Sequence, residues 1–531
     1  MIRKVIVLIL IGIFLYFSES SPAQDSFRLL ATIVGERECA SAGDVNGDGF
    51  KDIITGYSGG AGYVKIFLGS ANFDTIPDLQ IVGDGGSFGS EVGCAGDLNK
   101  DGYDDIIVGA PSASNPNNGA ELAGKAHIYF GGSPMDTVVD LILQDSDYHY
   151  GFGSSVISAG DVNSDGYDDA MVAAPVGWDA AGRVFIYFGG ENMDSIYDVR
   201  IEGHPDSAEF LGWSVAGIGD INSDGFDDVL IGSPWAGVHW GTGKASVYFG
   251  GDPMDSIPDV SFYGDSINFW NFGRVVASGG DFNGDGVPDI VVGGVSYAAR
   301  VFMKVSWSPE PVFDTLNLFG ENILPSAFGL KTSLVGDINK DGFDDVLISD
   351  YQCGIDLKGK AYVFYGGEEM DSVWDIELTG DGRLGKQFGL EVAFAGDVNG
   401  DDQDEILVAS YGDSGYAGKI FIYTSGSTSI DNPPTRERLN DFNLRQNYPN
   451  PFNPETIIEY VLFENSQVHL SIYNILSQHV RTLIDQYQKA GYKKTTWDGK
   501  DQAGREVSSG IYFYRLKTDS FIEVKKMLLL R

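Results

Sequence analysis

Residues 97–105 run Asp-Leu-Asn-Lys-Asp-Gly-Tyr-Asp-Asp, an acidic stretch with oxygen-bearing side chains at positions 1, 3, 5 and 9 and glycine at position 6. The pattern D-x-N-x-D-G-x-x-D occurs six times, and a degenerate seventh copy has Asp402 in place of the glycine and Glu405 in place of the last aspartate. The copies start at Asp44, Asp97, Asp161, Asp220, Asp281, Asp337 and Asp397. Their spacings are 53, 64, 59, 61, 56 and 60 residues. A period of this size indicates a propeller or a solenoid built from repeats.

The repeat extends on both sides of the acidic stretch. Nine residues before the first aspartate stands an apolar residue followed by glycine, in every repeat except the first. These residues are Phe88, Phe152, Leu211, Phe272, Phe328 and Phe388. Twelve residues after the first aspartate comes a corner of small residues such as Gly109-Ala110-Pro111, and short β-branched runs such as Ile106-Ile107-Val108 lie between. Such runs, bounded by glycine or proline, predict buried strands, and four strands per repeat are typical of a propeller blade.

These three elements at fixed offsets resemble the FG-GAP repeat of the integrin α-chain propeller and its bacterial relatives, over residues 26–425. The resemblance implies an all-β fold in which residues 25–425 form a seven-bladed β-propeller. It also implies how the ring closes, because Phe27 to Val34 would supply the outer strand of the last blade. Without that strand the terminal blades would expose unpaired edges.

The acidic stretches predict calcium binding. Side-chain oxygens at positions 1, 3, 5 and 9, with the carbonyl of position 7, form an all-oxygen set that selects a hard cation, and calcium suits it better than magnesium. An EF-hand would need a glutamate at position 12, where these repeats have strand residues such as Val108, so we expect a hairpin loop. Six to seven structural Ca²⁺ sites are expected, and the seventh is the degenerate one.

The expected ligands are Asp44, Asn46, Asp48, Phe50 and Asp52; Asp97, Asn99, Asp101, Tyr103 and Asp105; Asp161, Asn163, Asp165, Tyr167 and Asp169; Asp220, Asn222, Asp224, Phe226 and Asp228; Asp281, Asn283, Asp285, Val287 and Asp289; Asp337, Asn339, Asp341, Phe343 and Asp345; and Asp397, Asn399, Asp401, Gln403 and Glu405.

The charge divides the chain into two parts. The formal net charge is −41, of which residues 442–531 carry +3 and the preceding 441 residues carry −44. Acidity of this size disfavours nucleic acid as a partner. Residues 1–24 are typical of a signal peptide, with Arg3 and Lys4 before an apolar run that is too short for a transmembrane anchor. The three cysteines are too few for a disulfide framework.

A polar linker, residues 426–441, precedes a C-terminal domain, residues 442–531. The domain begins Leu444-Arg445-Gln446-Asn447-Tyr448-Pro449-Asn450-Pro451-Phe452-Asn453-Pro454 and later contains Trp497-Asp498-Gly499 and Gly510-Ile511-Tyr512-Phe513-Tyr514. It resembles the type A sorting domain of type IX secretion substrates, which implies an immunoglobulin-like β-sandwich. The resemblance also implies passage through the outer membrane of a Gram-negative bacterium, followed by release or attachment at the surface. The secretion machinery is thus one expected partner.

No motif supports catalysis. The string Gly56-Tyr57-Ser58-Gly59-Gly60 matches G-x-S-x-G, but it follows a propeller strand and not a strand-to-helix elbow. We therefore expect a monomeric, non-catalytic adhesion or ligand-binding protein, with an extracellular protein or glycan as its ligand. A glycan-binding protein that serves polysaccharide degradation, or less favourably a polysaccharide-active enzyme, is the alternative.

The predicted ligand face lies opposite the acidic loops, where aromatic side chains suit stacking on sugars or protein contacts. Its candidate residues are Tyr148, His149, Tyr150, Trp178, Trp235, His239, Trp240, Trp270 and Tyr297. They can equally pack the glycine-rich loops around them.

Overall fold

The computed structural model describes residues 26–114, 123–145, 151–176, 180–204, 207–237, 242–264, 271–294, 298–306, 312–320, 326–353, 357–368, 372–380, 387–411, 418–426, 443–444, 447, 452, 454–462, 466–475, 478–488, 491–518 and 521–530. Throughout these ranges the regular structure is β-strand, and no helix occurs in them. The expected signal peptide lies outside the described residues, as do residues 427–441 of the expected linker, whereas Gly426 is the last residue of the strand Gly418–Gly426. The described ranges also hold no helical segment with the length and apolarity needed to cross a bilayer.

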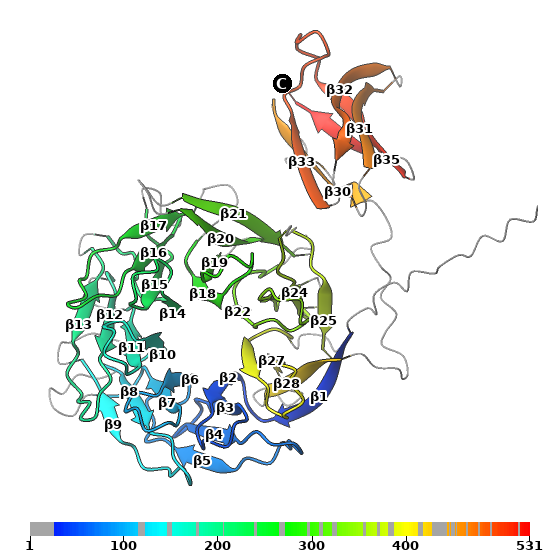
Figure 1. Cartoon of the computed structure of the whole chain (residues 1–531). Helices are drawn as coiled ribbons and strands as arrows, with labels where there is room; N and C mark the ends of the chain where they lie inside the picture. The colour runs from blue at the N-terminus through cyan, green and yellow to red at the C-terminus, as the bar shows by residue number, and fades with distance from the viewer. Residues whose placement is uncertain are drawn as a thin grey trace, which may run out of the picture.

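Seven four-stranded antiparallel sheets occupy residues 26–426 (Figure 1). Their strands are β2 (Glu38–Gly43), β3 (Asp52–Tyr57), β4 (Tyr63–Phe67) and β5 (Leu79–Val82); β6 (Glu91–Gly96), β7 (Asp105–Ala110), β8 (Lys125–Tyr129) and β9 (Leu141–Leu143); β10 (Ser155–Gly160), β11 (Asp169–Ala174), β12 (Arg183–Tyr187) and β13 (Val199–Glu202); β14 (Val215–Gly219), β15 (Asp228–Ser233), β16 (Lys244–Tyr248) and β17 (Val260–Tyr263); β18 (Val275–Gly280), β19 (Asp289–Gly293), β20 (Ala298–Ser306) and β21 (Val312–Phe319); β22 (Thr332–Leu334), β23 (Val346–Asp350), β24 (Lys360–Phe364) and β25 (Ile376–Thr379); and β26 (Val392–Gly396), β27 (Glu405–Tyr411), β28 (Gly418–Gly426) and β1 (Ser26–Val34).

The sheets follow one another around a ring, as in a propeller (Figure 1). The first strand of each sheet contacts the first strand of the next, and β26 of the last sheet contacts β2 of the first. Second strands such as β7 are buried on both faces, which is why their sequences are continuous apolar runs. Outer strands such as β5 alternate between buried and exposed residues.

The first and last parts of this region share one sheet. β1 pairs antiparallel with β28, and Phe27 lies opposite Ser425 while Val34 lies opposite Lys419. The expectation that Phe27 to Val34 would complete the last sheet is therefore confirmed. Because β1 covers the edge of β28, the ring closes with strands from both ends of the repeat region.

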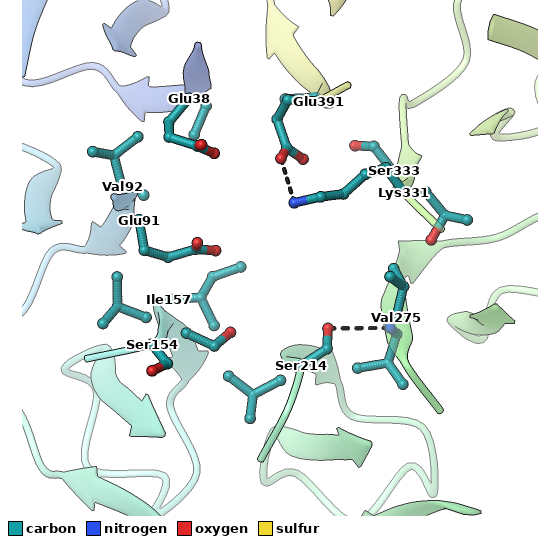
Figure 2. A pocket seen from close by; sticks show the side chains of 18 of the residues that line it. Glu38, Glu91, Val92, Ser154, Ile157, Ser214, Val275, Lys331, Ser333 and Glu391 are labelled. Atoms are coloured by element: carbon teal, nitrogen blue, oxygen red, sulfur yellow. Dashed lines mark hydrogen bonds and ion pairs between the residues drawn. The ribbon is translucent and has the colours of Figure 1, made fainter. Parts of the chain in front are cut away.

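The first strands surround a cavity of about 680 Å³ on the ring axis (Figure 2). Its lining comes mainly from the beginnings of these strands, whereas the acidic loops follow the strand ends.

The C-terminal domain consists of two further sheets. One is ordered β29 (Asn443–Leu444), β30 (Thr456–Leu462) and β33 (Gly491–Trp497), and the other β32 (His479–Gln488), β31 (Ser466–Asn474), β34 (Gly510–Lys517) and β35 (Ile522–Leu529). Buried side chains from both sheets, among them Ile458, Leu470 and Trp497, form a core that contains residues of this domain alone.

Strand β1 offers a direct test of closure, because neighbouring side chains point to opposite faces. Ile33 is 3% exposed and Val34 is 65% exposed. Ile33→Ala should lower the free energy of opening of β28 by about 2 kcal/mol, since it leaves a cavity in the core. Val34→Ala should change it by less than about 0.5 kcal/mol. Amide hydrogen exchange in residues 418–426 measures both effects.

The amides of β16 serve as an internal reference, because β16 belongs to the fourth sheet, three sheets around the ring from the sheet that contains β1. Equal effects of the two substitutions on β28 would mean that β1 does not close the sheet in solution.

Candidate metal centre

Each acidic loop makes two left-handed bends that its sequence allows. In the second loop Lys100 has φ +59° and Gly102 has φ +92°. The corresponding glycines of the other intact loops also have positive φ, and in the seventh loop Asp402 adopts φ +62°. The expected sharp bend at position 6 is therefore present in all seven loops, although in the last one a residue other than glycine makes it.

The side chains at positions 1, 3 and 5 gather over the bend. In the second loop the Asp97 carboxylate accepts hydrogen bonds from the N–H groups of Asp101 (3.0 Å) and Gly102 (2.9 Å). The Asn99 side-chain oxygen accepts from the Asp101 N–H at 2.9 Å, and Asp101 Oδ1 accepts from the Tyr103 N–H at 3.1 Å. Three oxygen-bearing side chains thus converge on one exposed turn.

The carboxylate at position 9 is fully buried and crosses between strands. Asp105 Oδ2 accepts the Leu98 N–H at 2.9 Å, and its Oδ1 accepts the Gly131 N–H, beyond the third strand of the sheet, at 2.8 Å. The same pair of bonds is made by Asp52, Asp169, Asp228 and Asp345. The acidic motif predicts this residue only as a metal ligand, and the structure shows that it also joins the loop to the third strand.

Burial changes the acidity of these carboxyl groups. Removal from water raises the pKa of Asp105 to about 7, although the two backbone hydrogen bonds lower it, and the neighbouring carboxylates of Asp101 and Asp97 raise it further. The pKa of Asp169 is raised to about 8 by the same causes. A nearby positive charge would keep such groups ionised.

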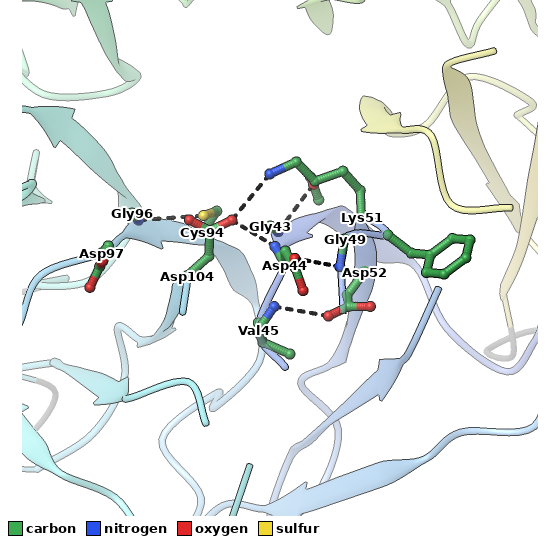
Figure 3. Close-up of polar contacts among 12 residues, drawn as sticks. Gly43, Asp44, Val45, Gly49, Lys51, Asp52, Cys94, Gly96, Asp97 and Asp104 are labelled. Carbon is green, nitrogen blue, oxygen red and sulfur yellow. Dashed lines mark hydrogen bonds and ion pairs between the residues drawn. The ribbon is translucent and has the colours of Figure 1, made fainter. Parts of the chain in front are cut away.

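In four loops an aspartate at position 8 links the loop to the preceding sheet. Asp104 Oδ2 accepts the Asp44 N–H of the first loop at 2.6 Å, and Lys51 Nζ lies 3.2 Å from the same oxygen (Figure 3). A Cβ atom at Gly43 would collide with the Asp104 carboxylate, which explains why glycine precedes the first aspartate. Equivalent bonds run from Asp168 to Asp97, from Asp227 to Asp161 and from Asp344 to Asp281.

The donor set of the intact loops fits a hard divalent cation. It consists of carboxylate and amide oxygens, contains no nitrogen or sulfur ligand, and lies on a turn with carbonyl groups nearby. In the structure these oxygens accept loop N–H groups. No cluster of three or more His, Cys, Asp or Glu side chains stands in metal-holding geometry within the described ranges.

The seventh loop is arranged differently. Asn399 Nδ2 donates to Glu405 Oε1 at 2.7 Å, whereas Asn99 Nδ2 in the second loop donates to Asp101 Oδ2 at 3.0 Å. The longer glutamate at position 9 thus draws the amide inward, away from the carboxylate at position 5. This loop fits a cation less well than the other six do.

Of the predicted ligand-face aromatics, only Trp235 belongs to the described part of the chain. Its ring packs against Phe210 at 4.8 Å and Trp213 at 4.7 Å between centroids, and the Arg274 guanidinium lies 5.9 Å from its centroid. Tyr148, His149, Tyr150, Trp178, His239, Trp240, Trp270 and Tyr297 lie outside the described residues. At Trp235 the geometry is that of an aromatic cluster between neighbouring sheets.

In the C-terminal domain, motifs that are far apart in the sequence share one core. The Asn447 N–H donates to the Tyr514 hydroxyl at 2.8 Å, and Asn447 Nδ2 donates to Thr456 Oγ1 at 2.9 Å. The Trp497 ring packs against Phe452 at 5.6 Å and Tyr512 at 5.1 Å between centroids. The three quoted motifs therefore stabilise one another.

Comparison with known proteins identifies both parts of the chain. The FG-GAP repeat model matches residues 91–129, 211–248 and 272–300, the FG-GAP-like repeat model matches residues 44–108, and the model of a secretion system C-terminal sorting domain matches residues 446–530.

Integrin α chains are among the relatives. Integrin alpha-5 of Xenopus laevis is 30% identical over 226 residues, 39% of this chain and 20% of that protein. Integrin alpha-8 of Mus musculus is 32% identical over 222 residues, 39% of this chain and 20% of that protein. The match thus spans about a fifth of the length of these relatives.

A solved structure of PorZ, described as an essential bacterial surface component of the type-IX secretion system of Porphyromonas gingivalis, is similar at a TM-score of 0.35 and 13% identity, covering 90% of this chain and 58% of that one. The family models are more informative. The chain therefore carries FG-GAP repeats similar to those of integrin α chains and ends in a secretion-system sorting domain, which marks it for export by type IX secretion to the cell surface or the extracellular space.

Proposed function

We propose that this protein is a calcium-loaded, seven-bladed β-propeller that binds an extracellular ligand without catalysis, as an adhesion protein does. The carrying observation is the set of six intact acidic loops, each with the same convergence of side chains at positions 1, 3 and 5. Calcium at these loops would be structural. It would hold together carboxylates that otherwise repel one another, and the fourth side-chain ligand would be the buried residue at position 9.

The proposed division of the chain follows its composition and its sheets. Residues 1–24 are the signal peptide, residues 25–425 the propeller, residues 426–441 the linker, and residues 442–531 an immunoglobulin-like sorting domain. The seven sheets with closed first-strand contacts support seven blades. The separate two-sheet core supports an independent C-terminal domain.

A protein ligand is a better proposal than a glycan. Sugar stacking needs an open aromatic face, but Phe210 and Trp213 pack against the Trp235 ring. Catalysis has no support from the acidic loops, which combine carboxylates with neither a nucleophile nor a neighbouring base.

The first test concerns calcium. EDTA should lower the melting temperature of the purified protein, and added Ca²⁺ should restore it. At free calcium a hundredfold above the dissociation constant, each independent site adds about 2.7 kcal/mol to the free energy of unfolding. Equilibrium dialysis should count six to seven ions per chain. Asp224→Ala should remove one ion and lower the melting temperature in calcium.

Asp194→Ala is the matched control. Asp194 also accepts a backbone N–H in an exposed turn, from Ile196 at 2.7 Å, but it lies outside the acidic loops. It should leave the ion count unchanged. Superimposable melting curves with EDTA and with Ca²⁺ would refute the calcium proposal.

The second test concerns the sorting domain. A chain that ends at Ser425 keeps nearly all of the β1–β28 pairing, so it should melt and bind calcium like the full chain when purified. In its native host it should accumulate in the periplasm, because it lacks the domain that the outer-membrane machinery recognises. Cell fractionation with an antibody against the propeller measures its location.

A full-length chain with Trp497→Asp gives an independent comparison, because Trp497 is fully buried in the sorting-domain core. It should also fail to reach the surface. Surface delivery of the chain that ends at Ser425 would show that export does not depend on residues 442–531.

A further inference from the structure

The axial cavity is lined by one recurring position of the repeat. This position lies six residues before the first aspartate of each acidic loop, and in all seven repeats its residue borders the cavity. The seven residues are Glu38, Glu91, Ser155, Ser214, Val275, Lys331 and Glu391. The ring thus places three carboxylates and one ammonium group around a partly open cavity of about 680 Å³.

The charges in this ring are unequally paired. Figure 2 shows Lys331 and Glu391 joined by an ion pair on one wall, with Glu38 and Glu91 on the other. Glu38 and Glu91 make no ion pair or side-chain hydrogen bond with another described residue. The cavity therefore contains two carboxylates for which the chain provides no direct cationic partner in the described ranges.

The environment of these carboxylates penalises their charge. Removal from water raises the pKa of Glu38 to about 8, and repulsion by Glu391 and Glu91 adds to that rise, while Lys331 and Arg37 oppose it. Burial raises the pKa of Glu91 to about 7, with Lys331 opposing and Glu391 adding to the rise. Burying an unpaired charge is costly, and a bound cation would remove that cost.

We propose that the axial cavity binds an alkylammonium group between Glu38 and Glu91. An ammonium group is a compact charge with three donors, which suits two carboxylates and a neighbouring hydroxyl. The chain's own Lys331 ammonium, seated against Glu391, shows that this cavity accommodates such a pair. The Arg274 guanidinium instead lies over the Trp213 ring, at 5.2 Å from its centroid. The axial cavity would thus be the site at which the proposed extracellular ligand binds, and this inference rests on the proposed binding function.

The test is a calorimetric titration of the full chain, with calcium present, using 1,5-diaminopentane as the probe. The diamine should bind with saturation, and 1,5-pentanediol should not. Glu38→Gln and Glu91→Gln should each weaken binding by about tenfold, because each removes a charge-assisted hydrogen bond. Glu368→Gln, at an exposed position outside the cavity, should leave affinity unchanged.

Proton release on binding distinguishes direct contact between the two glutamates and the ammonium group from a purely structural role of the glutamates. Because a bound cation favours the ionised carboxylates, binding at pH 7 should release protons, and affinity should rise between about pH 6 and pH 9. Titrations in buffers of different ionisation enthalpy measure that release. The other titratable or charged groups at or beside the cavity are Arg37, Cys39, Cys94, Arg274, Lys331, Tyr351 and Glu391.

Two further probes identify the source of the ammonium group. Binding of Nα-acetyl-lysine methylamide as tightly as the diamine would indicate a lysine side chain of a protein ligand, and binding of the diamine alone would indicate a free amine. The second probe is Nα-acetyl-arginine methylamide, which carries a guanidinium group in place of the ammonium group. Binding of this arginine analogue alone, equal binding of the diol, or equal affinities of the parent and both glutamine variants would overturn the inference. If the variants still show calcium-dependent melting, such a result leaves the proposed function standing.

Discussion

The antiparallel pairing of β1 with β28 is the contact on which the rest of the propeller-like region depends. Among the described strands each sheet packs mainly on its two neighbours, so an open row of sheets would leave apolar faces exposed at both ends. The residues that pair are at opposite ends of the repeat region. The entropic cost of closing so long a loop is still moderate, because it grows only with the logarithm of the loop length. Closure also creates the axis, because first strands surround a common cavity only when the row becomes a ring.

The acidic loops stabilise the ring through their own hydrogen bonds, in addition to any cation that they bind. At position 9 a buried carboxylate joins its loop to the third strand of the same sheet. Where position 8 is an aspartate such as Asp104, its carboxylate joins the loop to the preceding sheet. Where position 8 is Pro288, this link cannot form between the fourth and fifth sheets, since proline has no carboxylate. The same short motif therefore contributes hydrogen bonds within sheets and between them. A cation bound at its exposed turn would stabilise contacts that already hold the ring together.

The strands and the period could be predicted from the sequence, because short apolar runs mark the strands and the recurring acidic motif marks the period. The closing strand was implied by the resemblance to FG-GAP repeat proteins. Sequence reasoning missed the position-8 link although aspartate recurs there at Asp104, Asp168, Asp227, Asp344 and Asp404, because the motif was defined by possible metal ligands alone. It also missed the axial ring. That position changes from glutamate to serine, valine and lysine, so no pattern marks it, and only closure brings its members together.

That variation is itself informative about the cavity. Repeat positions that pack against the neighbouring sheet keep the same residue, as the glycine before each first aspartate does. At the six of these glycines whose surroundings are described, the position-8 residue of the next loop lies against the backbone, whether that residue is aspartate, proline or lysine. The residues on the axis face one another across a partly open cavity, so packing does not require them to be alike. Holding three partly buried carboxylates there with a single lysine works against stability unless something else supplies positive charge. The excess of negative charge on the axis is therefore better explained by a ligand than by the fold.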